Sequence, residues 1–145
     1  MYFEDLSIGQ SAESSHTVTQ DDIVAFAALS GDRNAVHLDP EFAAKTPFKG
    51  VIAHGMLSAS YISAILGTRL PGEGTIYLGQ SLSFLAPVRP GDVVVTTVTI
   101  KETREKGRSR GEVICQTTAR VGAVTVLTGE ATVMVPRRNV ALNAA

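Results

Sequence analysis

The sequence predicts an α+β fold, because helical and strand-like patterns occupy different halves of the chain. Residues 75–136 are rich in β-branched side chains, in segments separated by turn residues, which is typical of an antiparallel sheet. Residues 50–68 contain no Asp, Glu, Lys or Arg and many small side chains. A helix without a charged face is expected to be buried on most sides. We therefore expect a sheet that curls around one central helix.

Two helices are expected before the central one, and both have recognisable end signals. Thr19 suits the N-cap of the first, with acidic side chains in the turn that follows, where the helix dipole favours anions. Gly31 suits its C-terminal end. Asp39 suits the N-cap of a second, short helix over 40–45, because a proline occupies its first position.

The remaining regular segments are expected to be strands. An edge segment is expected over 3–9, and strands over 14–19, 77–85, 92–103, 113–121 and 123–135. Apolar and polar side chains alternate in the fourth of these strands, which is typical of a half-buried strand. His16 is interpreted as a surface histidine of the first strand.

Composition and charge exclude several classes of protein. A chain of 145 residues with a net charge of −1 suits one domain and gives no broad attraction to nucleic acid or an anionic membrane. The apolar part of 50–68 is too short and too rich in serine to span a bilayer. The single cysteine, Cys115, excludes an internal disulfide, and the acidic N-terminus lacks the features of a signal peptide. We expect one cytoplasmic domain over 1–136 and a tail over 137–145.

The segment from Gly31 to His37 carries the candidate chemistry. Asp32 and His37 are five residues apart, which fits neither neighbouring positions on a helix nor one face of a strand. Their side chains can converge only in an irregular loop, and Gly31 and Asn34 are residue types that tolerate one. A carboxylate and a neutral imidazole that hold one water form an acid/base pair. The alternative interpretation is a turn aspartate and a surface histidine.

This motif resembles that of the MaoC-like hot-dog hydratases, the R-specific enoyl-CoA hydratases. The resemblance rests on residues 28–37, with Ala35 where the family usually has proline, and on the segments 53–56 and 76–84. It covers about residues 3–136 and is closest to the short members that supply hydroxyacyl monomers for polyester storage. It implies an antiparallel sheet wrapped around a long central helix, with an overhang of loops and short helices that carries the motif.

The resemblance also implies the reaction and the site. Asp32 and His37 share a catalytic water, without a metal, and add it to a trans-2-enoyl-CoA to give the (R)-3-hydroxyacyl-CoA. No cofactor is implied, because coenzyme A is part of the substrate. Asn34 is expected to orient the carboxylate or the loop, with a turn asparagine as the alternative. The Gly55 N–H is expected to hold the thioester oxyanion, since the first N–H groups of a helix are unpaired. Ser63 aligns with a serine of the family's site, although it also suits a crowded helix crossing.

Other interpretations remain open from the sequence. Asp32, His37 and His54 are possible metal ligands, but they lack zinc-type spacing and the resembled family uses no metal. His54 is better interpreted as a supporting or helix-start residue. A hot-dog thioesterase is the nearest rival enzyme, although thioesterases do not usually carry this Asp-Asn-His loop. A non-catalytic acyl-thioester-binding module is the rival from another class.

The substrate's remote parts and the assembly are less determined. Cations between Lys101 and Arg110 are numerous enough to meet the phosphates of coenzyme A, with a solvated hairpin around Gly107 as the alternative. The resemblance implies a homodimer with binding sites between the subunits. Neither the acyl chain length nor the pathway is fixed by the sequence.

Overall fold

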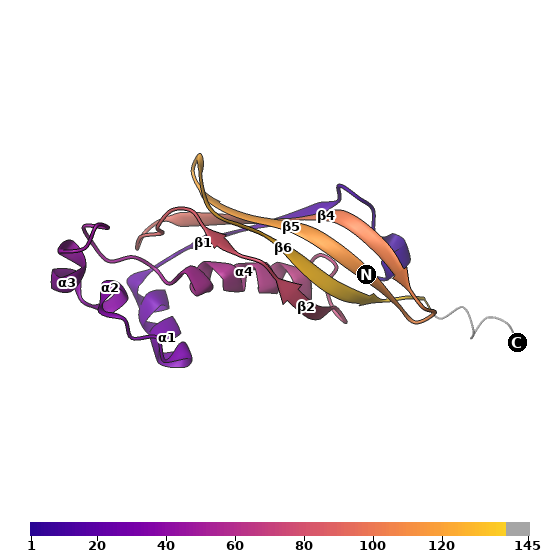
Figure 1. The fold of residues 1–145 in the computed structure, drawn as a ribbon, viewed down its shortest axis with the longest axis horizontal. Coiled ribbons are helices and arrows are strands. Elements are labelled where there is room, and N and C mark those ends of the chain that lie inside the picture. Colours follow the sequence, from indigo (N-terminus) through magenta and orange to yellow (C-terminus); the bar gives the residue numbers. More distant parts are fainter. Residues whose placement is uncertain (139–145) are drawn as a thin grey trace, which may run out of the picture.

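The protein is described by a computed structural model over residues 1–138. One antiparallel sheet curves around a central helix (Figure 1). The helical elements are η1 (Phe3–Asp5), α1 (Gln20–Ser30), α2 (Ala35–Leu38), α3 (Pro40–Ala44) and α4 (Gly55–Thr68). The strands are β1 (Ser11–Thr17), β2 (Ile76–Gln80), β3 (Ser83–Phe84), β4 (Val93–Lys106), β5 (Arg110–Val121) and β6 (Val124–Pro136). The prediction of an α+β fold is confirmed.

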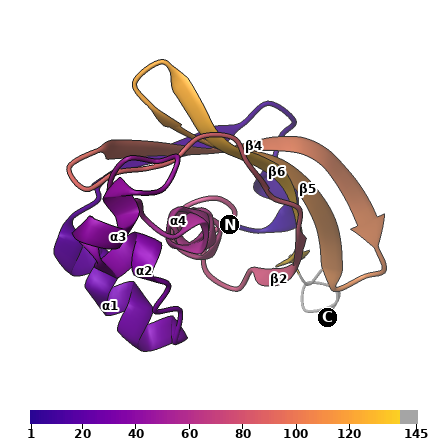
Figure 2. The ribbon, with the colours of Figure 1, turned by 60° about the vertical axis from the view of Figure 1, so that its left-hand side comes forward.

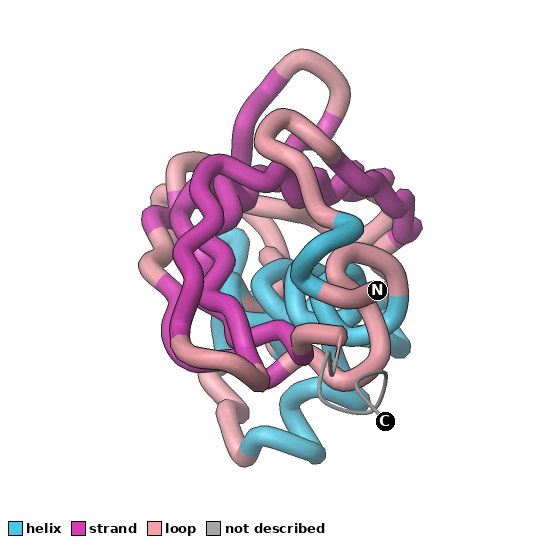
Figure 3. Tube along the Cα trace, turned by 90° about the vertical axis from the view of Figure 1, so that its right-hand side faces the viewer, coloured by secondary structure: helices cyan, strands magenta, loops and turns pink. Residues whose placement is uncertain are grey.

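The sheet has the order β1-β4-β5-β6-β2, and β3 pairs separately with β6. Every second side chain of β4 from Val94 to Ile100 is buried, and these side chains face α4, as the pleat requires. Figure 2 shows α4 nearly end-on inside the curve of the sheet, and Figure 3 shows the strands arching over the helices. The helix contributes the fully buried Ile62, Ile65 and Leu66 to this core. Burial of each such side chain stabilises the fold by about 1.5–3 kcal/mol.

The predicted ends of α1 and α3 are confirmed. Thr19 accepts a hydrogen bond from the Asp22 N–H, and Gly31 ends α1 in the left-handed conformation, with φ at 81°. Asp39 accepts hydrogen bonds from two N–H groups of α3, and Pro40 is its first residue. These ends are set by local chemistry, so the sequence contains all that is needed to place them.

The N-terminal segment differs from its prediction. Residues 3–9 were expected to form an edge segment, but η1 is a turn of 3-10 helix. The Asp5 carboxylate accepts the Tyr2 N–H at 3.0 Å, and the Asp5 N–H donates to the Tyr2 carbonyl at 3.0 Å. These two bonds bend the backbone away from an extended strand.

The first residues of the expected tail are held against this turn. Arg137 and Arg138 form ion pairs with Glu4 and Asp5, respectively. The Arg137 N–H also donates to the Ser109 carbonyl at 2.9 Å. Residues 139–145 of the expected tail lie outside the described part of the chain.

The helix α4 is buried on one face rather than on most sides. Its buried side chains are Leu57, Ser58, Ile62, Ile65 and Leu66. The opposite face is exposed and carries small side chains, at Ser60, Ser63, Ala64 and Gly67. Within residues 1–138, every helix falls short of the length and apolarity that crossing a membrane requires.

Candidate active site

A cavity of about 380 Å³ lies at the N-terminal end of α4. Its polar lining consists of Asp32, His37, His54, Gly55 and Ser58. Most of the remaining wall is apolar and includes the aromatic rings of Phe48 and Phe84. Phe48 brings the loop between α3 and α4 to the cavity. A few polar groups in an apolar cavity are typical of a small-molecule site.

Asp32 reaches the cavity because α1 ends at Ser30, two residues before it. The left-handed Gly31 turns the chain, and the Asp32 N–H donates to the Ser30 hydroxyl at 3.1 Å. One carboxylate oxygen, Oδ1, accepts the Asn34 N–H at 3.2 Å. The other makes no hydrogen bond with the described residues, so it can accept one from a ligand or a water.

His37 is carried by α2, a helical turn within the segment that was expected to be an irregular loop. The Asn34 side chain caps this turn by accepting the Val36 N–H at 3.2 Å, which suits both an asparagine that orients the loop and a turn asparagine. The His37 ring is 8% exposed, and its Nδ1–H donates to the Ile52 carbonyl at 2.7 Å. Since a carbonyl oxygen can only accept, this bond fixes the tautomer and leaves the lone pair on Nε2.

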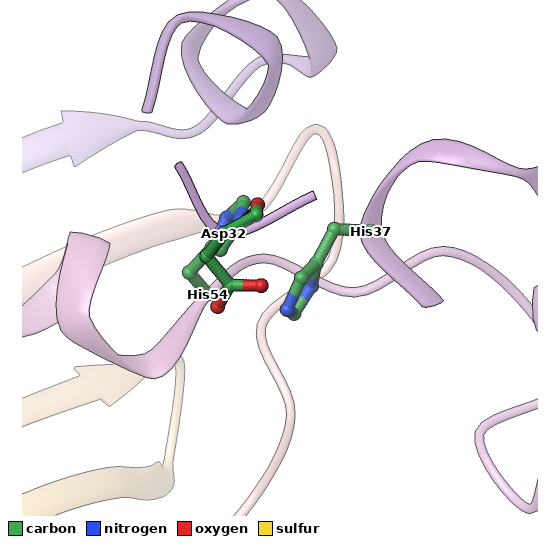
Figure 4. A group of neighbouring side chains, drawn as sticks. All are labelled: Asp32, His37 and His54. Atoms are coloured by element: carbon green, nitrogen blue, oxygen red, sulfur yellow. Dashed lines mark hydrogen bonds between the residues drawn. The ribbon is translucent and has the colours of Figure 1, made fainter. Parts of the chain in front are cut away.

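The predicted convergence of Asp32 and His37 is confirmed. One side-chain atom of each, together with one of His54, lies within 4.8 Å of the others. Figure 4 shows the Asp32 carboxylate pointing toward the His37 ring. A water that makes two hydrogen bonds of about 2.8 Å spans about 4.6 Å. The two side chains are therefore close enough to bind one water together.

Gly55 is the first residue of α4, as predicted. The N-cap residue His54 makes no side-chain capping bond, and the Gly55 N–H has no partner among the described residues. The positive end of the helix dipole adds to this free donor. A side chain at Gly55 would bring its Cβ to 2.6 Å from the Phe84 ring, so the glycine also makes room for Phe84.

The three ligand-type residues lie close enough together to hold a metal ion, but the two histidine rings are poorly oriented for one. The His37 and His54 rings are stacked, with centroids 3.8 Å apart and planes 27° apart. The lone pairs of stacked rings lie in nearly parallel planes and do not point at one common position. Tetrahedral zinc needs ligand lone pairs that converge on the ion at about 2.0–2.1 Å. The absence of a metal stays a prediction, which activity in the presence of a chelator would test.

Ser63 lies outside the cavity, and Ser58 takes its place in the wall. Ser58 is 3% exposed, whereas Ser63 is on the exposed face of α4. Five residues correspond to a rotation of about 140° around a helix, which accounts for the difference. Sequence reasoning missed Ser58 because the orientation of α4 is set by packing.

The hairpin over 101–110 lies at the end of the molecule opposite to the cavity (Figure 1). Two of its five cations form ion pairs within the chain: Arg104 pairs with Glu102 and Glu112, and Lys101 pairs with Glu130. A solvated hairpin is therefore favoured. The hairpin is too far from the cavity of its own chain to bind the phosphates of a coenzyme A held there. His16 is a surface residue, as expected, and pairs with Asp22.

A curled antiparallel sheet around one helix, with an acid/base pair at the helix N-terminus, defines a hot-dog protein with the site of an enzyme. The chain belongs to the MaoC-like domain family, whose model matches residues 6–123.

Named relatives cover nearly the whole chain. The (R)-specific enoyl-CoA hydratase of Rhodospirillum rubrum is 52% identical over 137 residues, which cover 94% of this chain and 93% of that protein. The 3-hydroxybutyryl-CoA dehydratase of Methylorubrum extorquens is 47% identical, over 95% of this chain and 86% of that one. Among solved structures, the (R)-hydratase of Aeromonas caviae, described as involved in PHA biosynthesis, superposes with a TM-score of 0.86 at 46% identity, over 92% of this chain and 99% of that one.

Proposed function

We propose that this protein is an R-specific enoyl-CoA hydratase, which adds water to a trans-2-enoyl-CoA to give the (R)-3-hydroxyacyl-CoA. The observation that carries the proposal is one cavity shared by the Asp32 carboxylate, the His37 ring and the free Gly55 N–H. The names of the relatives from Rhodospirillum rubrum and Aeromonas caviae support the same reaction.

The acid/base pair supplies the water and the proton. A water between the free Asp32 oxygen and His37 Nε2 loses a proton to the pair as its oxygen bonds to C3 of the substrate. The electrons of the double bond move toward the thioester, and C2 then receives a proton from the pair. One water is consumed and no electrons leave the substrate, so the reaction is balanced without a cofactor or a metal. The pair returns to C2 the proton that it takes from the water.

The N-terminus of α4 stabilises the charge that develops between these two steps. As water adds to C3, negative charge accumulates on the thioester oxygen, and the Gly55 N–H is placed to donate to it. A donor of this kind typically lowers the barrier by about 3 kcal/mol. The helix dipole acts in the same direction.

The apolar wall suits the acyl chain of the substrate. Apart from its polar lining, the cavity is walled by side chains such as Phe48, Met56, Phe84 and Leu85. Apolar walls leave no polar group unpaired when an acyl chain displaces water, and they disfavour charged acyl groups.

A homodimer is part of the proposal. The strand β2 ends the sheet, and apolar side chains are exposed on β2 and β3, including Leu78 at 54% and Phe84 at 54%. An exposed edge of this kind is a template for pairing with a second copy. The face of α4 that carries Ser63 is exposed beside it, so Ser63 is proposed to contact the site of the paired form. Sedimentation of the purified protein would test this assembly.

The cellular setting is proposed from the composition of the chain and from its relatives. A single buried cysteine suits the reducing cytoplasm. The Aeromonas caviae structure is described as that of a hydratase in PHA biosynthesis, which supports a role in supplying hydroxyacyl-CoA to a polyester synthase.

The test is a spectrophotometric assay with crotonyl-CoA in the presence of a chelator. We expect loss of the conjugated enoyl absorbance, and oxidation of the product only by a dehydrogenase specific for the R isomer. Asp32→Asn is expected to lower kcat by about 10²-fold or more while acyl-CoA affinity stays within about threefold. His16→Gln, which changes a histidine outside the cavity, is the matched control.

Other outcomes identify the rival functions. Release of free thiol without loss of the enoyl group would make the protein a thioesterase. Binding of acyl-CoA with neither reaction, over short and medium chains, would leave a binding module. Loss of hydration in the chelator would show that a metal takes part.

A further inference from the structure

A third residue, His54, contacts both members of the acid/base pair, Asp32 and His37. The His54 side chain lines the cavity but is only 2% exposed. Its Nε2–H donates to the backbone carbonyl of Asp32 at 2.9 Å, and its ring stacks on that of His37. We propose that His54 is a positioning residue that fixes Asp32 relative to His37. The inference deepens the proposed function and rests on it.

The hydrogen bond from His54 is what ties the Asp32 loop to the rest of the fold. Every other hydrogen bond that residues 31–34 make within the described chain has its partner between residues 27 and 37. The bond from His54 spans 22 positions in the sequence and links the loop to the start of α4. Without it, no polar contact with another element would restrain the Asp32 loop.

The His37 side of the site is restrained independently of Asp32. The Ile52 carbonyl holds Nδ1 of His37, the Ile52 N–H donates to the Val36 carbonyl at 3.3 Å, and Gln20 donates to the His37 carbonyl at 3.2 Å. The Phe26 ring packs against His54, with centroids 4.9 Å apart, and so supports the stack from behind. A loss of the His54 bond should therefore move Asp32 while His37 keeps its place.

The tautomer of His54 shows which chemical property the site uses. The Asp32 carbonyl can only accept, so the proton is on Nε2 and Nδ1 carries a lone pair. Nδ1 is buried and makes no hydrogen bond. A donor at the position of Nε2 is therefore the feature required, together with a shape that fills the wall.

Substitution of His54 by glutamine or asparagine tests the N–H donor apart from the other properties of the histidine. Glutamine carries an N–H group about as far from Cα as Nε2 of histidine, whereas the shorter asparagine does not reach the Asp32 carbonyl. Asparagine is also a favourable N-cap, so His54→Asn is expected to keep α4 folded. The two variants differ by one methylene group and by the presence of the bond.

The experiment compares kcat and KM for crotonyl-CoA in wild type, His54→Asn and His54→Gln. We expect His54→Asn to lower kcat by about 10- to 100-fold, with KM within about threefold, because a small misplacement of a catalytic group is costly. We expect His54→Gln to recover at least about tenfold of the loss. His16→Leu is the matched control, since His16 also makes one hydrogen bond, to Asp22 at 3.0 Å, and stacks on a ring, that of Tyr61.

Hydrogen exchange of the peptide that covers residues 31–38 gives a readout without activity. We expect faster exchange of these amides in His54→Asn than in wild type, and wild-type rates in His54→Gln. Equal kcat values for the two amide variants, an effect on KM alone, or unchanged exchange in His54→Asn would overturn the positioning role. An inactive wild type would refute the proposed function instead, and the exchange data would still decide the role of His54.

Discussion

The N-termini of α1 and α4 both begin with unpaired backbone N–H groups, but only that of α1 is capped by side chains. At α1, the Thr19 hydroxyl accepts the Asp22 N–H at 3.1 Å, and the Asp22 carboxylate accepts the Thr19 N–H at 3.0 Å. At α4, the N-cap residue His54 turns its ring to Asp32, and the Gly55 N–H stays free at the cavity. The first end is closed and stabilises the fold, whereas the second is left open for charge on a ligand.

The charges around the two ends follow the same division. The Thr19 N–H, and then the His16 side chain, lower the pKa of the Asp22 carboxyl, so α1 has a permanent anion at its positive end. The first turn of α4 has no acidic residue. An anion there would compete with the thioester oxygen for the same donors. The charge-free sequence of 50–68 therefore has a functional reason as well as one of packing.

The largest effect on kcat is expected when the free N–H at the start of α4 is removed. Gly55→Pro removes the N–H, and proline is compatible with the first position of a helix and with the extended conformation of His54. Gly55→Ala adds a comparable Cβ near Phe84 but keeps the N–H. We expect kcat of the proline variant to lie about 10²- to 10³-fold below that of the alanine variant.

Steady-state kinetics with crotonyl-CoA measure this difference, and thermal unfolding shows whether both variants fold equally well. If the two substitutions reduced kcat to the same extent, the loss would come from crowding of Phe84, and the N–H would not be the oxyanion donor.

A smaller effect, on stability alone, is expected when the closed end is opened. Thr19→Ala removes the acceptor of the Asp22 N–H, so we expect the free energy of unfolding to fall by about 1 kcal/mol. We expect kcat to be unchanged, because this end of α1 contacts no substrate group. Urea denaturation and the hydratase assay check the two expectations. A kcat that fell with stability would show that the closed end also serves the site.

The smallest effect is a change in stability with pH, which is expected from protonation of Asp22 at the start of α1. Because the pKa of Asp22 lies below its ordinary value of 3.8, its contribution to stability is present above that pH and is lost as the pH falls through the lowered pKa. Asp22→Asn keeps an acceptor but does not titrate. We expect the unfolding free energy of wild type to fall more steeply below about pH 4 than that of the variant. Parallel curves from pH 6 to pH 3 would contradict this.

The parts of the fold that were predictable are those decided within a few residues. Thr19, Gly31 and Asp39 mark helix ends by their own side chains or backbone, and each was placed correctly. The turn α2 was missed because its four residues are too few for a periodic pattern. Its N-cap, Asn34, is a residue type that is as common in loops as at helix starts. The turn η1 was missed for the same reason.

The parts of the site that were not predictable depend on packing between distant segments. The convergence of Asp32 and His37 followed from the motif. The inward orientation of Ser58, rather than Ser63, depends on which face of α4 meets the sheet. The hydrogen bond from His54 to a backbone carbonyl 22 positions away has no spacing that a sequence can show.

The contacts that hold Met1 and Arg138 near the C-terminal end of α4 have a practical consequence. The Met1 ammonium donates to the Pro71 carbonyl, just beyond the last turn of α4, and Arg138 pairs with Asp5 nearby. The cavity lies at the first turn of the same helix, at the other end of the molecule (Figure 1). A tether attached at Met1 would therefore orient the protein with the end that contains the cavity away from the support. Protein captured in this way on a sensor surface should bind acyl-CoA as freely as it does in solution.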